Sequence, residues 1–247
     1  MQKKMRLGII SALAEEQHGL IDAMQGPARH VHAMREVTAG NLWEIDAVCV
    51  LSRIGKVAAA MTATILVEKF GVTHIVFTGV AGSGDPGVHV GDIVVAETLV
   101  QHDMNASPLF PRFEVPLTGL MQIASDAQLT SRLATAARDF LANEAEQPRL
   151  HRGLVASGDQ FIAQRAQLAG LKTALPGLLA VEMEGAAVAQ VCFELGVPFA
   201  VIRTISDNAN EDAAVDFMHF VQTVASRYAF GVMEKFCRSF TVPVIPA

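Results

Sequence analysis

Carboxylates follow three apolar, strand-like runs of this sequence. Residues 7–12 lead into Glu15 and Glu16, residues 178–181 into Glu182 and Glu184, and residues 198–202 into a segment that stops at Asp207. In an open α/β sheet, ligands bind in the crevice beyond the carboxyl ends of the strands. We therefore expect acids from separate strands to share one small-molecule site. Such acids indicate acid/base chemistry or recognition of hydroxyl groups rather than capture of phosphate.

A glycine-rich segment imitates a nucleotide-binding loop. Residues 82–87 read Gly-Ser-Gly-Asp-Pro-Gly, which satisfies the pattern of a dinucleotide fingerprint. That fingerprint needs a helix to begin at the loop, whereas Pro86 interrupts it and residues 88–95 continue as extended structure. Gly55 and Lys56 lack the spacing of a P-loop. We expect a tight turn that presents backbone N–H groups to a ligand, and no nucleotide cofactor.

Other reactive patterns in the sequence are weak. The eight histidines show no metal-ligand spacing, and no Gly-x-Ser-x-Gly elbow indicates a serine hydrolase. His102 and Asp103 follow a predicted strand, where they either touch a ligand or form a structural pair. Cys49, Cys192 and Cys237 lie far apart in apolar runs, which is typical of reduced core residues.

Strands and helices alternate along the chain. Apolar patterns predict strands over residues 7–13, 42–51, 73–78, 92–98 and 150–157, helices over 15–24, 56–70, 125–144, 163–174 and 214–236, and a strand–helix–strand unit over 178–206. Ser125 is the predicted N-cap of the helix over 125–144. Residues 104–119 contain three prolines and are expected to form an ordered loop over the sheet end or at an interface.

This order of elements favours an α/β fold. We expect one domain over residues 1–247: a three-layer sandwich with a central mixed, mainly parallel sheet flanked by helices. The chain has 247 residues, of which 51% are hydrophobic, so it can build one large core. Pro243 and Pro246 mark a tail that we expect to fray from about residue 240.

Charge and hydropathy exclude several classes of protein. The net charge of -6 argues against a nucleic-acid or acidic-membrane surface. No apolar run approaches the roughly 18 residues that a membrane helix needs. Residues 3–14 resemble a secretory leader, but their apolar run is short, and we interpret it as the first buried strand. These features predict a cytoplasmic protein.

Seven short blocks carry a family resemblance. They lie at residues 8–16, 54–60, 78–82, 90–95, 157–162, 180–184 and 205–207, and include Ile-Gly-Lys-Val-Ala-Ala-Ala, Ser-Gly-Asp-Gln-Phe-Ile, Ala-Val-Glu-Met-Glu and Ile-Ser-Asp. In this order they resemble the nucleoside phosphorylase/nucleosidase superfamily and, within it, the 5′-methylthioadenosine/S-adenosylhomocysteine nucleosidases. The resemblance implies a homodimer that acts on a small-molecule nucleoside and water without a cofactor or metal.

The resemblance also implies a reaction, in which an N-glycosidic bond is hydrolysed to give adenine and a 5-thioribose. Asp207 would protonate the adenine N7, with Ser206 orienting it. Glu16 would position and deprotonate the attacking water, although the residue types alone leave Glu15 open. Glu184 would accept hydrogen bonds from the ribose hydroxyls, and its place at a helix start favours the ionised form.

The resemblance implies an apolar wall around the nucleoside as well. Phe161 would stack on adenine while the backbone of Ile162 reads the base edge. Met183 would pack on the sugar and Phe217 beside the 5′ substituent, with core packing as the alternative role for both. Ala81 and Gly82 belong to the glycine turn expected near the ligand.

The nucleophile and the 5′ substituent stay open. Phosphorylases of this superfamily commonly carry an arginine where this chain has Phe77, and basic residues near Glu15 and Glu16, which favours water over phosphate here. Arg53 stands where the nucleosidases often have a small residue, and residues 108–116 diverge. A purine nucleoside phosphorylase, a nucleosidase for 5′-deoxyadenosine or futalosine, and a nucleoside-binding protein without turnover are the alternatives.

Overall fold

The computed structural model describes residues 4–240; the predicted frayed tail with Pro243 and Pro246 lies outside them. Ten strands form one mixed sheet within this range. They are β1 (Leu7–Ser11), β2 (Gln25–His32), β3 (Arg35–Leu42), β4 (Ile45–Leu51), β5 (His74–Ser83), β6 (Ile93–Gln101), β7 (Ile123–Ala124), β8 (Leu150–Ser157), β9 (Leu178–Glu182) and β10 (Phe199–Asp207).

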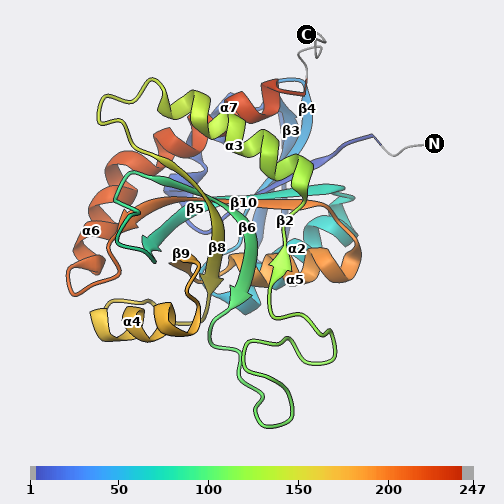
Figure 1. The fold of residues 1–247 in the computed structure, drawn as a ribbon. Helices are drawn as coiled ribbons and strands as arrows, with labels where there is room; N and C mark the ends of the chain where they lie inside the picture. Colours follow the sequence, from blue (N-terminus) through green and yellow to red (C-terminus); the bar gives the residue numbers. More distant parts are fainter. Residues whose placement is uncertain (1–3, 241–247) are drawn as a thin grey trace, which may run out of the picture.

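Helices connect these strands and cover them (Figure 1). They are the 3-10 turn η1 (Ala14–Glu16), α1 (His18–Ala23), α2 (Lys56–Phe70), α3 (Ala127–Leu141), α4 (Arg165–Ala174), α5 (Gly185–Leu195), α6 (Ala213–Phe220), the π turn η2 (Val221–Ala225) and α7 (Ser226–Arg238). None of the helices in the described part of the chain combines the length and apolar character needed to cross a bilayer.

Five strands of the sheet close into a ring. β5 pairs parallel with β10 and antiparallel with β9. β9 pairs in turn with β8, and β6 lies between β8 and β10 and completes the ring. The predicted mixed sheet flanked by helices is confirmed, but the flat three-layer arrangement is wrong in detail. Register shifts between Ile205 and Asp207, Ala96 and Thr98, and Leu154 and Val155 mark irregular pairing at which the strands can bend.

Helices cover the sheet on two sides. α2 and α5 pack together on one face, and α3 and α7 pack together on the other (Figure 1). Leu66 and Cys192 belong to the core on the first side, whereas Leu133, Cys49 and Cys237 belong to the core on the second. The prediction that the three cysteines are unpaired core residues is confirmed.

Local chemistry fixes where helices begin and end. α2 has the predicted bounds and ends at Gly71, whose left-handed φ of 64° suits glycine. The predicted cap of the next helix is wrong: the Asp126 side chain, rather than Ser125, accepts the N–H of Leu129 at 2.8 Å and α3 begins at Ala127. The predicted C-terminal helix is present as α6, η2 and α7 in succession.

The first part of the chain differs most from the prediction. The helix predicted over residues 15–24 is split at Gln17, because the Gln17 side chain donates to the carbonyls of Ile9 at 3.3 Å and Val50 at 3.0 Å. The hairpin of β2 and β3 was not predicted, since β2 is exposed along most of its length and lacks an apolar pattern. The strand predicted over 42–51 starts only at Ile45, after a left-handed turn.

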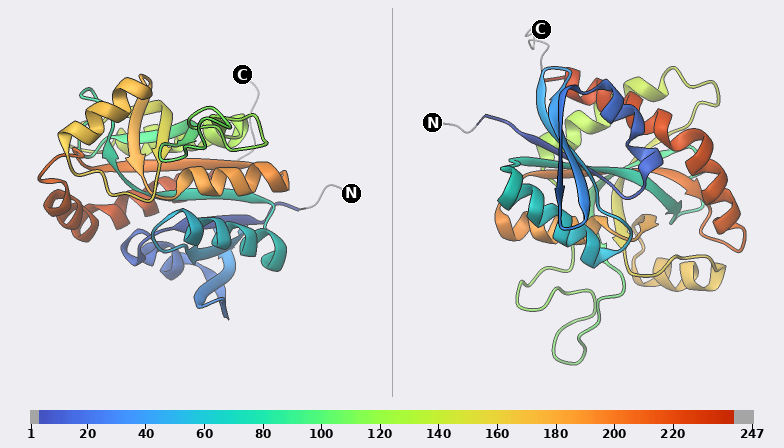
Figure 2. Two further views of the ribbon diagram at one scale, coloured as in Figure 1. Left: turned by 90° about the horizontal axis from the view of Figure 1, so that it is seen from below. Right: turned by 180° about the vertical axis from the view of Figure 1, so that it is seen from behind.

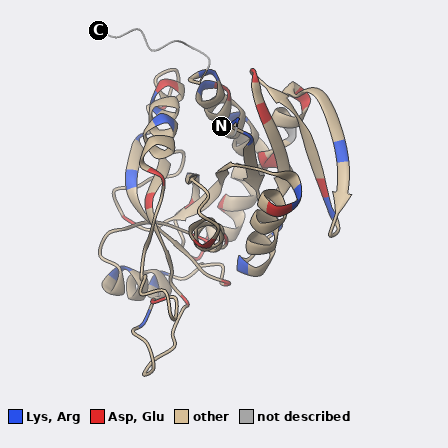
Figure 3. Ribbon diagram, turned by 90° about the vertical axis from the view of Figure 1, so that its right-hand side faces the viewer, with Lys and Arg blue, Asp and Glu red and all other residues tan. Residues whose placement is uncertain are grey.

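The loop between β6 and β7 extends away from the sheet and its helices (Figure 2). It includes the proline-containing segment that was expected to lie over the sheet end or at an interface. Acidic and basic positions are interspersed along the ribbon in the view of Figure 3.

Candidate active site

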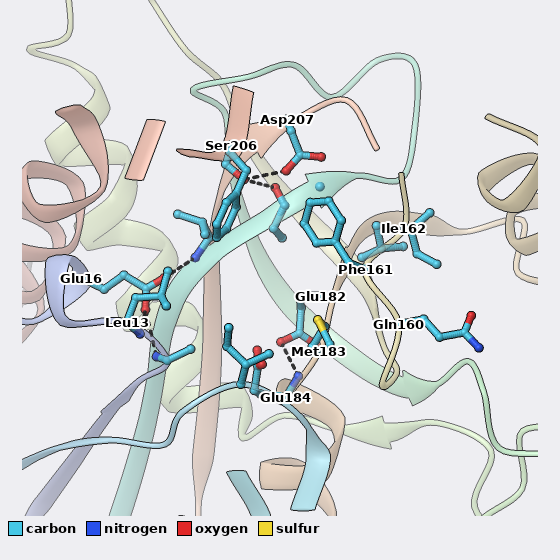
Figure 4. A pocket seen from close by; sticks show the side chains of 17 residues that line it. Leu13, Glu16, Gln160, Phe161, Ile162, Glu182, Met183, Glu184, Ser206 and Asp207 are labelled. Carbon is cyan, nitrogen blue, oxygen red and sulfur yellow. Dashed lines mark hydrogen bonds between the residues drawn. The ribbon is translucent and has the colours of Figure 1, made fainter. Parts of the chain in front are cut away.

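One cavity of about 220 Å³ gathers the candidate residues (Figure 4). The ten residues to which the resemblance gave a place in the site all line it: Glu16, Ala81, Gly82, Phe161, Ile162, Met183, Glu184, Ser206, Asp207 and Phe217. Ala12, Leu13, Ile54, Val80, Gln160, Val181 and Glu182 complete the lining. The carboxylates come from separate elements, as the strand-end pattern led us to expect: η1 after β1, the β9–α5 junction, and the end of β10.

Glu16 is fixed at the end of the cavity next to β1. It is 2% exposed, whereas Glu15 is exposed to solvent and does not line the cavity. Oε2 of Glu16 accepts the N–H groups of Ala12 at 2.9 Å and Leu13 at 3.0 Å, and Oε1 accepts that of Val80 at 3.1 Å. Burial raises the pKa of Glu16, although these N–H groups oppose the rise.

β5 has a glycine where it passes this acid. A Cβ atom on Gly79 would lie 3.0 Å from Glu16 Oε1. Further along the same strand, a Cβ atom on Gly82 would lie 2.9 Å from Asp207 Oδ1. Both acids therefore approach the β5 backbone at positions where a side chain would displace them.

Asp207 is held at the opposite end of the cavity. Its Oδ2 accepts the hydroxyl of Ser206 at 2.8 Å, and its Oδ1 accepts the N–H of Ala209 at 2.9 Å. Burial raises the pKa of Asp207, and the charge of Asp216 adds to the rise. A carboxyl group in this environment retains its proton at a higher pH than a solvated aspartate.

Glu184 is buried at the start of α5 but takes no amide of that helix. Its Oε1 accepts the N–H of Gly55 at 2.8 Å, from the loop before α2. Burial, reinforced by the neighbouring Glu182 charge, raises the pKa of Glu184 to about 8. This direction is opposite to the expectation that the helix start favours the ionised form of Glu184.

Glu182, rather than Glu184, binds the backbone N–H groups at the start of α5. Its carboxylate accepts the N–H groups of Glu184 and Gly185, and Ser157 donates its hydroxyl to the same group. Ser157 in turn accepts the N–H of Ala186 at 2.7 Å. The first amides of α5 are thus satisfied by Glu182 and Ser157, which leaves Glu184 dependent on Gly55.

A buried arginine was missed in the sequence. Arg203 is 1% exposed and its Nη2 lies 2.6 Å from Glu182 Oε2. Its guanidinium stacks 4.0 Å from the centre of the Phe77 ring, and its charge lowers the pKa of both Glu16 and Glu184. The signal was an arginine directly after the apolar run of residues 198–202, because such a buried charge requires an acid as a partner.

A polar network fixes the loops at the rim. Lys56 Nζ lies 2.6 Å from Asp103 Oδ1, and Asp103 Oδ2 accepts the N–H of Asp159 at 2.9 Å. Asp159 Oδ1 accepts the N–H of Lys56 at 2.8 Å. The segment before Phe161 is thus joined to the start of α2. His102 is buried against Gly158, so His102 and Asp103 are structural rather than part of the cavity lining.

Aromatic side chains form the outer wall. Phe161 and Phe217 make an edge-to-face contact with their ring centres 5.8 Å apart. Phe161 is 45% exposed, whereas Ile162 is buried. A flat, apolar ligand could enter beside these rings, with protonated carboxyl groups inside the cavity available as donors and acceptors.

This arrangement matches proteins of one superfamily. The family model of the phosphorylase superfamily matches residues 6–238. A 5′-methylthioadenosine/S-adenosylhomocysteine nucleosidase of Shewanella frigidimarina is 36% identical over 217 residues, which cover 88% of this chain and 92% of the relative.

Solved structures give the same result. A nucleosidase of that name from S. pneumoniae, in a structure with a transition-state inhibitor, is 32% identical with a TM-score of 0.87, and the match covers 96% of this chain and 100% of the other. A futalosine hydrolase of Helicobacter pylori is 31% identical with a TM-score of 0.84, covering 94% and 97% of the two chains. The chain belongs to the phosphorylase superfamily and, within it, to the 5′-methylthioadenosine/S-adenosylhomocysteine nucleosidase family.

Proposed function

We propose that this protein hydrolyses the N-glycosidic bond of 5′-thio-substituted adenosines, such as 5′-methylthioadenosine and S-adenosylhomocysteine, to adenine and the thioribose. The observation that carries the proposal is the convergence of Glu16, Glu184 and Asp207 on one cavity in a chain of this family. Each acid faces a different part of a nucleoside placed there. The proposal assigns one step of the reaction to each.

Asp207 acts on the leaving group. Its raised pKa favours a proton on the carboxyl, which it donates to the purine N7 so that the base departs as a neutral molecule. Ser206 and the N–H of Ala209 fix both oxygens and therefore the direction of the donated proton. Phe161 stacks on the base, and the Ile162 backbone contacts its edge.

Glu16 acts on the nucleophile. Three backbone N–H groups hold its carboxylate, and we assign the attacking water to this carboxylate. As the bond to the base breaks, positive charge develops on the sugar ring, and Glu16 accepts the proton of the attacking water. The electrons of the broken carbon–nitrogen bond leave with the base, and the water oxygen forms a new bond to the anomeric carbon.

Glu184 binds the ribose hydroxyls, with Met183 against the sugar. Burial and the Glu182 charge raise the pKa of Glu184 to about 8, which favours the protonated carboxyl. The positive charge that develops on the sugar ring favours the ionised carboxylate. Hydrogen bonds from the hydroxyls to Glu184 are then stronger in the transition state than in the bound substrate, which is the condition for faster chemistry.

Water rather than phosphate is the proposed nucleophile. A phosphate at this position would meet the Glu16 carboxylate, and Arg203, the buried cation whose charge acts on Glu16, is already paired with Glu182. The test is a panel of nucleosides incubated with and without phosphate and analysed by chromatography. Free sugar in both conditions supports the hydrolase; a sugar 1-phosphate formed only with phosphate would establish a phosphorylase.

A second candidate substrate is a futalosine-type nucleoside. The similarity to a futalosine hydrolase, at 31% identity, supports its inclusion in the panel. The two candidates share the proposed steps at the base and the ribose and differ in the 5′ substituent. The ratio of kcat/KM values across the panel decides between them.

We also propose a homodimer of single-domain subunits. Large apolar side chains are exposed on α2, on α5 and on the loop between β6 and β7: Val57, Met61, Phe193, Leu195, Leu109, Leu117 and Met121. α2 and α5 lie side by side (Figure 1), so a second copy would cover them together. Light scattering after size-exclusion chromatography tests the dimer.

Three free, buried thiols support a reducing compartment, and we propose the cytoplasm.

A further inference from the structure

A second cavity opens beside the nucleoside pocket. Its volume is about 480 Å³, and its lining includes Arg35, Arg53, Ile54, Gly55 and Asp159, together with Val57 and Met61 of the face that we propose meets a second copy. Ile54 also lines the nucleoside pocket, and the N–H of Gly55 is bound to Glu184. The second cavity therefore begins where the ribose end of a bound nucleoside would lie.

Arg53 brings a cation to this cavity. Its side chain is exposed, and within residues 4–240 it makes one hydrogen bond, from Nη2 to the carbonyl oxygen of Met34 at 2.8 Å. The backbone of Arg53 has a φ of 68°, in the left-handed region that favours glycine. This position therefore carries a long charged side chain although its backbone conformation favours glycine.

Arg35 adds a second cation, which is buried. Its guanidinium donates to the hydroxyl of Thr62 at 2.6 Å and to the carbonyl oxygens of Ala33 at 2.9 Å and Ala58 at 3.2 Å. All of these partners are neutral, and among the described residues no carboxylate lies within ion-pair distance of Arg35 or Arg53. Burial lowers the pKa of Arg35, and the like charge of Arg53 lowers it further, so an anion between them would relieve both effects.

Asp159 is the acid of this cavity. Its Oδ1 accepts the N–H of Lys56 at 2.8 Å, and Oδ2 has no hydrogen-bond partner in the part of the chain that the structure describes. The cavity thus presents two guanidinium groups together with one carboxylate. That pattern of charge matches an amino acid, which carries an anionic carboxylate and a cationic ammonium on the same carbon.

We propose that this second cavity binds the charged end of the 5′ substituent, and that Arg53 selects nucleosides whose tail ends in an amino acid. The proposal rests on the proposed function, which supplies the nucleoside. S-adenosylhomocysteine fits both parts: its purine and ribose occupy the first cavity, its thioether passes Ile54, and its carboxylate reaches Arg53. Its ammonium group lies toward Asp159. 5′-Methylthioadenosine ends before the second cavity and gains nothing there.

The test compares three nucleosides on the full-length protein. S-adenosylhomocysteine has a charged tail, 5′-butylthioadenosine has an uncharged tail of similar length, and 5′-methylthioadenosine has a short one. Arg53→Gly removes the side chain and suits the left-handed backbone, Arg53→Lys retains the charge, and Arg29→Ala on exposed β2 is the control outside both cavities. Circular dichroism confirms that each variant is folded.

Arg53→Gly is expected to lower the ratio of kcat/KM for S-adenosylhomocysteine to that for 5′-methylthioadenosine by about tenfold, the scale of one charge-assisted contact. Arg53→Lys should recover most of the ratio, Arg29→Ala should leave it unchanged, and added salt should lower it in the wild type. The inference is overturned if the ratio survives in Arg53→Gly, or if butylthioadenosine loses as much as S-adenosylhomocysteine. Cleavage of none of the three would instead overturn the proposed function itself.

Discussion

Arg203 and Glu182 form an ion pair with 2.6 Å between Nη2 and Oε2, and both side chains are almost completely buried. The pair joins β10 to β9, and Glu182 is itself part of the lining of the cavity that holds the three acids. Glu182 also binds the first amides of α5. The pair therefore supports the floor of the site and the start of a helix at once.

Removing one member of this pair should destabilise the fold strongly. Arg203→Met leaves the Glu182 charge buried without its cation, and we expect a loss of about 3–5 kcal/mol in the free energy of unfolding. Urea denaturation measures it. The double variant Arg203→Met with Glu182→Gln should recover part of the loss, since no unpaired charge remains. Equal stability of the single variant and the wild type would contradict a structural role for the pair.

The leaving-group role of Asp207 predicts a separation of binding from turnover. Asp207→Asn keeps the shape of the side chain but cannot donate an acidic proton, so we expect kcat to fall by about 10²–10⁴-fold. The affinity for a non-hydrolysable nucleoside analogue, measured by calorimetry, should change much less. Ser206→Ala, which removes only an orienting hydroxyl, should have a smaller effect on kcat. A near-normal rate in Asp207→Asn would remove this residue from the reaction.

Neighbouring glutamates give a matched test of the proposed base. Glu16 is buried in the cavity while Glu15 is exposed outside it. Glu16→Gln should reduce kcat by about 10²-fold or more, because an amide cannot accept the water proton. Glu15→Gln should leave the rate at its wild-type value. If the two effects were reversed, the water would have to bind at another place.

Glu184 predicts a loss of stability on raising the pH. Its pKa is raised from 4.5 to about 8 in the folded protein. Between these values the folded state keeps a proton that the unfolded chain has released, so the free energy of unfolding falls as the pH rises through this window. The raised pKa values of Glu16 and Asp207 act in the same direction.

Glu184→Gln isolates this contribution. The variant keeps an uncharged side chain at every pH. Between about pH 5 and pH 8 we therefore expect its free energy of unfolding to fall by on the order of 1–3 kcal/mol less than that of the wild type. Urea denaturation at both pH values measures the difference. Glu44→Gln, at an exposed position, is the control. Parallel curves for wild type and Glu184→Gln would show that Glu184 is ionised in the folded protein.

The positions of the acids could be predicted because they depend on chain order. Glu16 follows β1 and Asp207 ends β10, and parallel strands deliver their carboxyl ends to one edge. The ionisation state of Glu184 could not be predicted, since it depends on Glu182 occupying the helix amides first. Both residues flank Met183, and sequence spacing alone does not show which one faces the helix and which one the cavity.

The closure of five strands into a ring could not be predicted from the sequence pattern either. Apolar runs predict that β5, β9 and β10 exist, but not that β5 pairs with both of the others. The irregular register near Ile205 that accompanies this closure has no signature in residue type. Arg203 was visible as a charged residue directly after an apolar run, yet its partner could be identified only once β9 and β10 were placed.

The ring of strands has a consequence for the protein during its synthesis. β10 fills the place between β5 and β6 and carries Asp207 at its end. A ribosome-bound chain that has emerged only as far as α5 already contains Glu16 and Glu184 but has neither the proton donor nor the strand that closes the ring. Catalytic competence should therefore arrive late and abruptly, and an incomplete chain should leave cellular nucleosides intact.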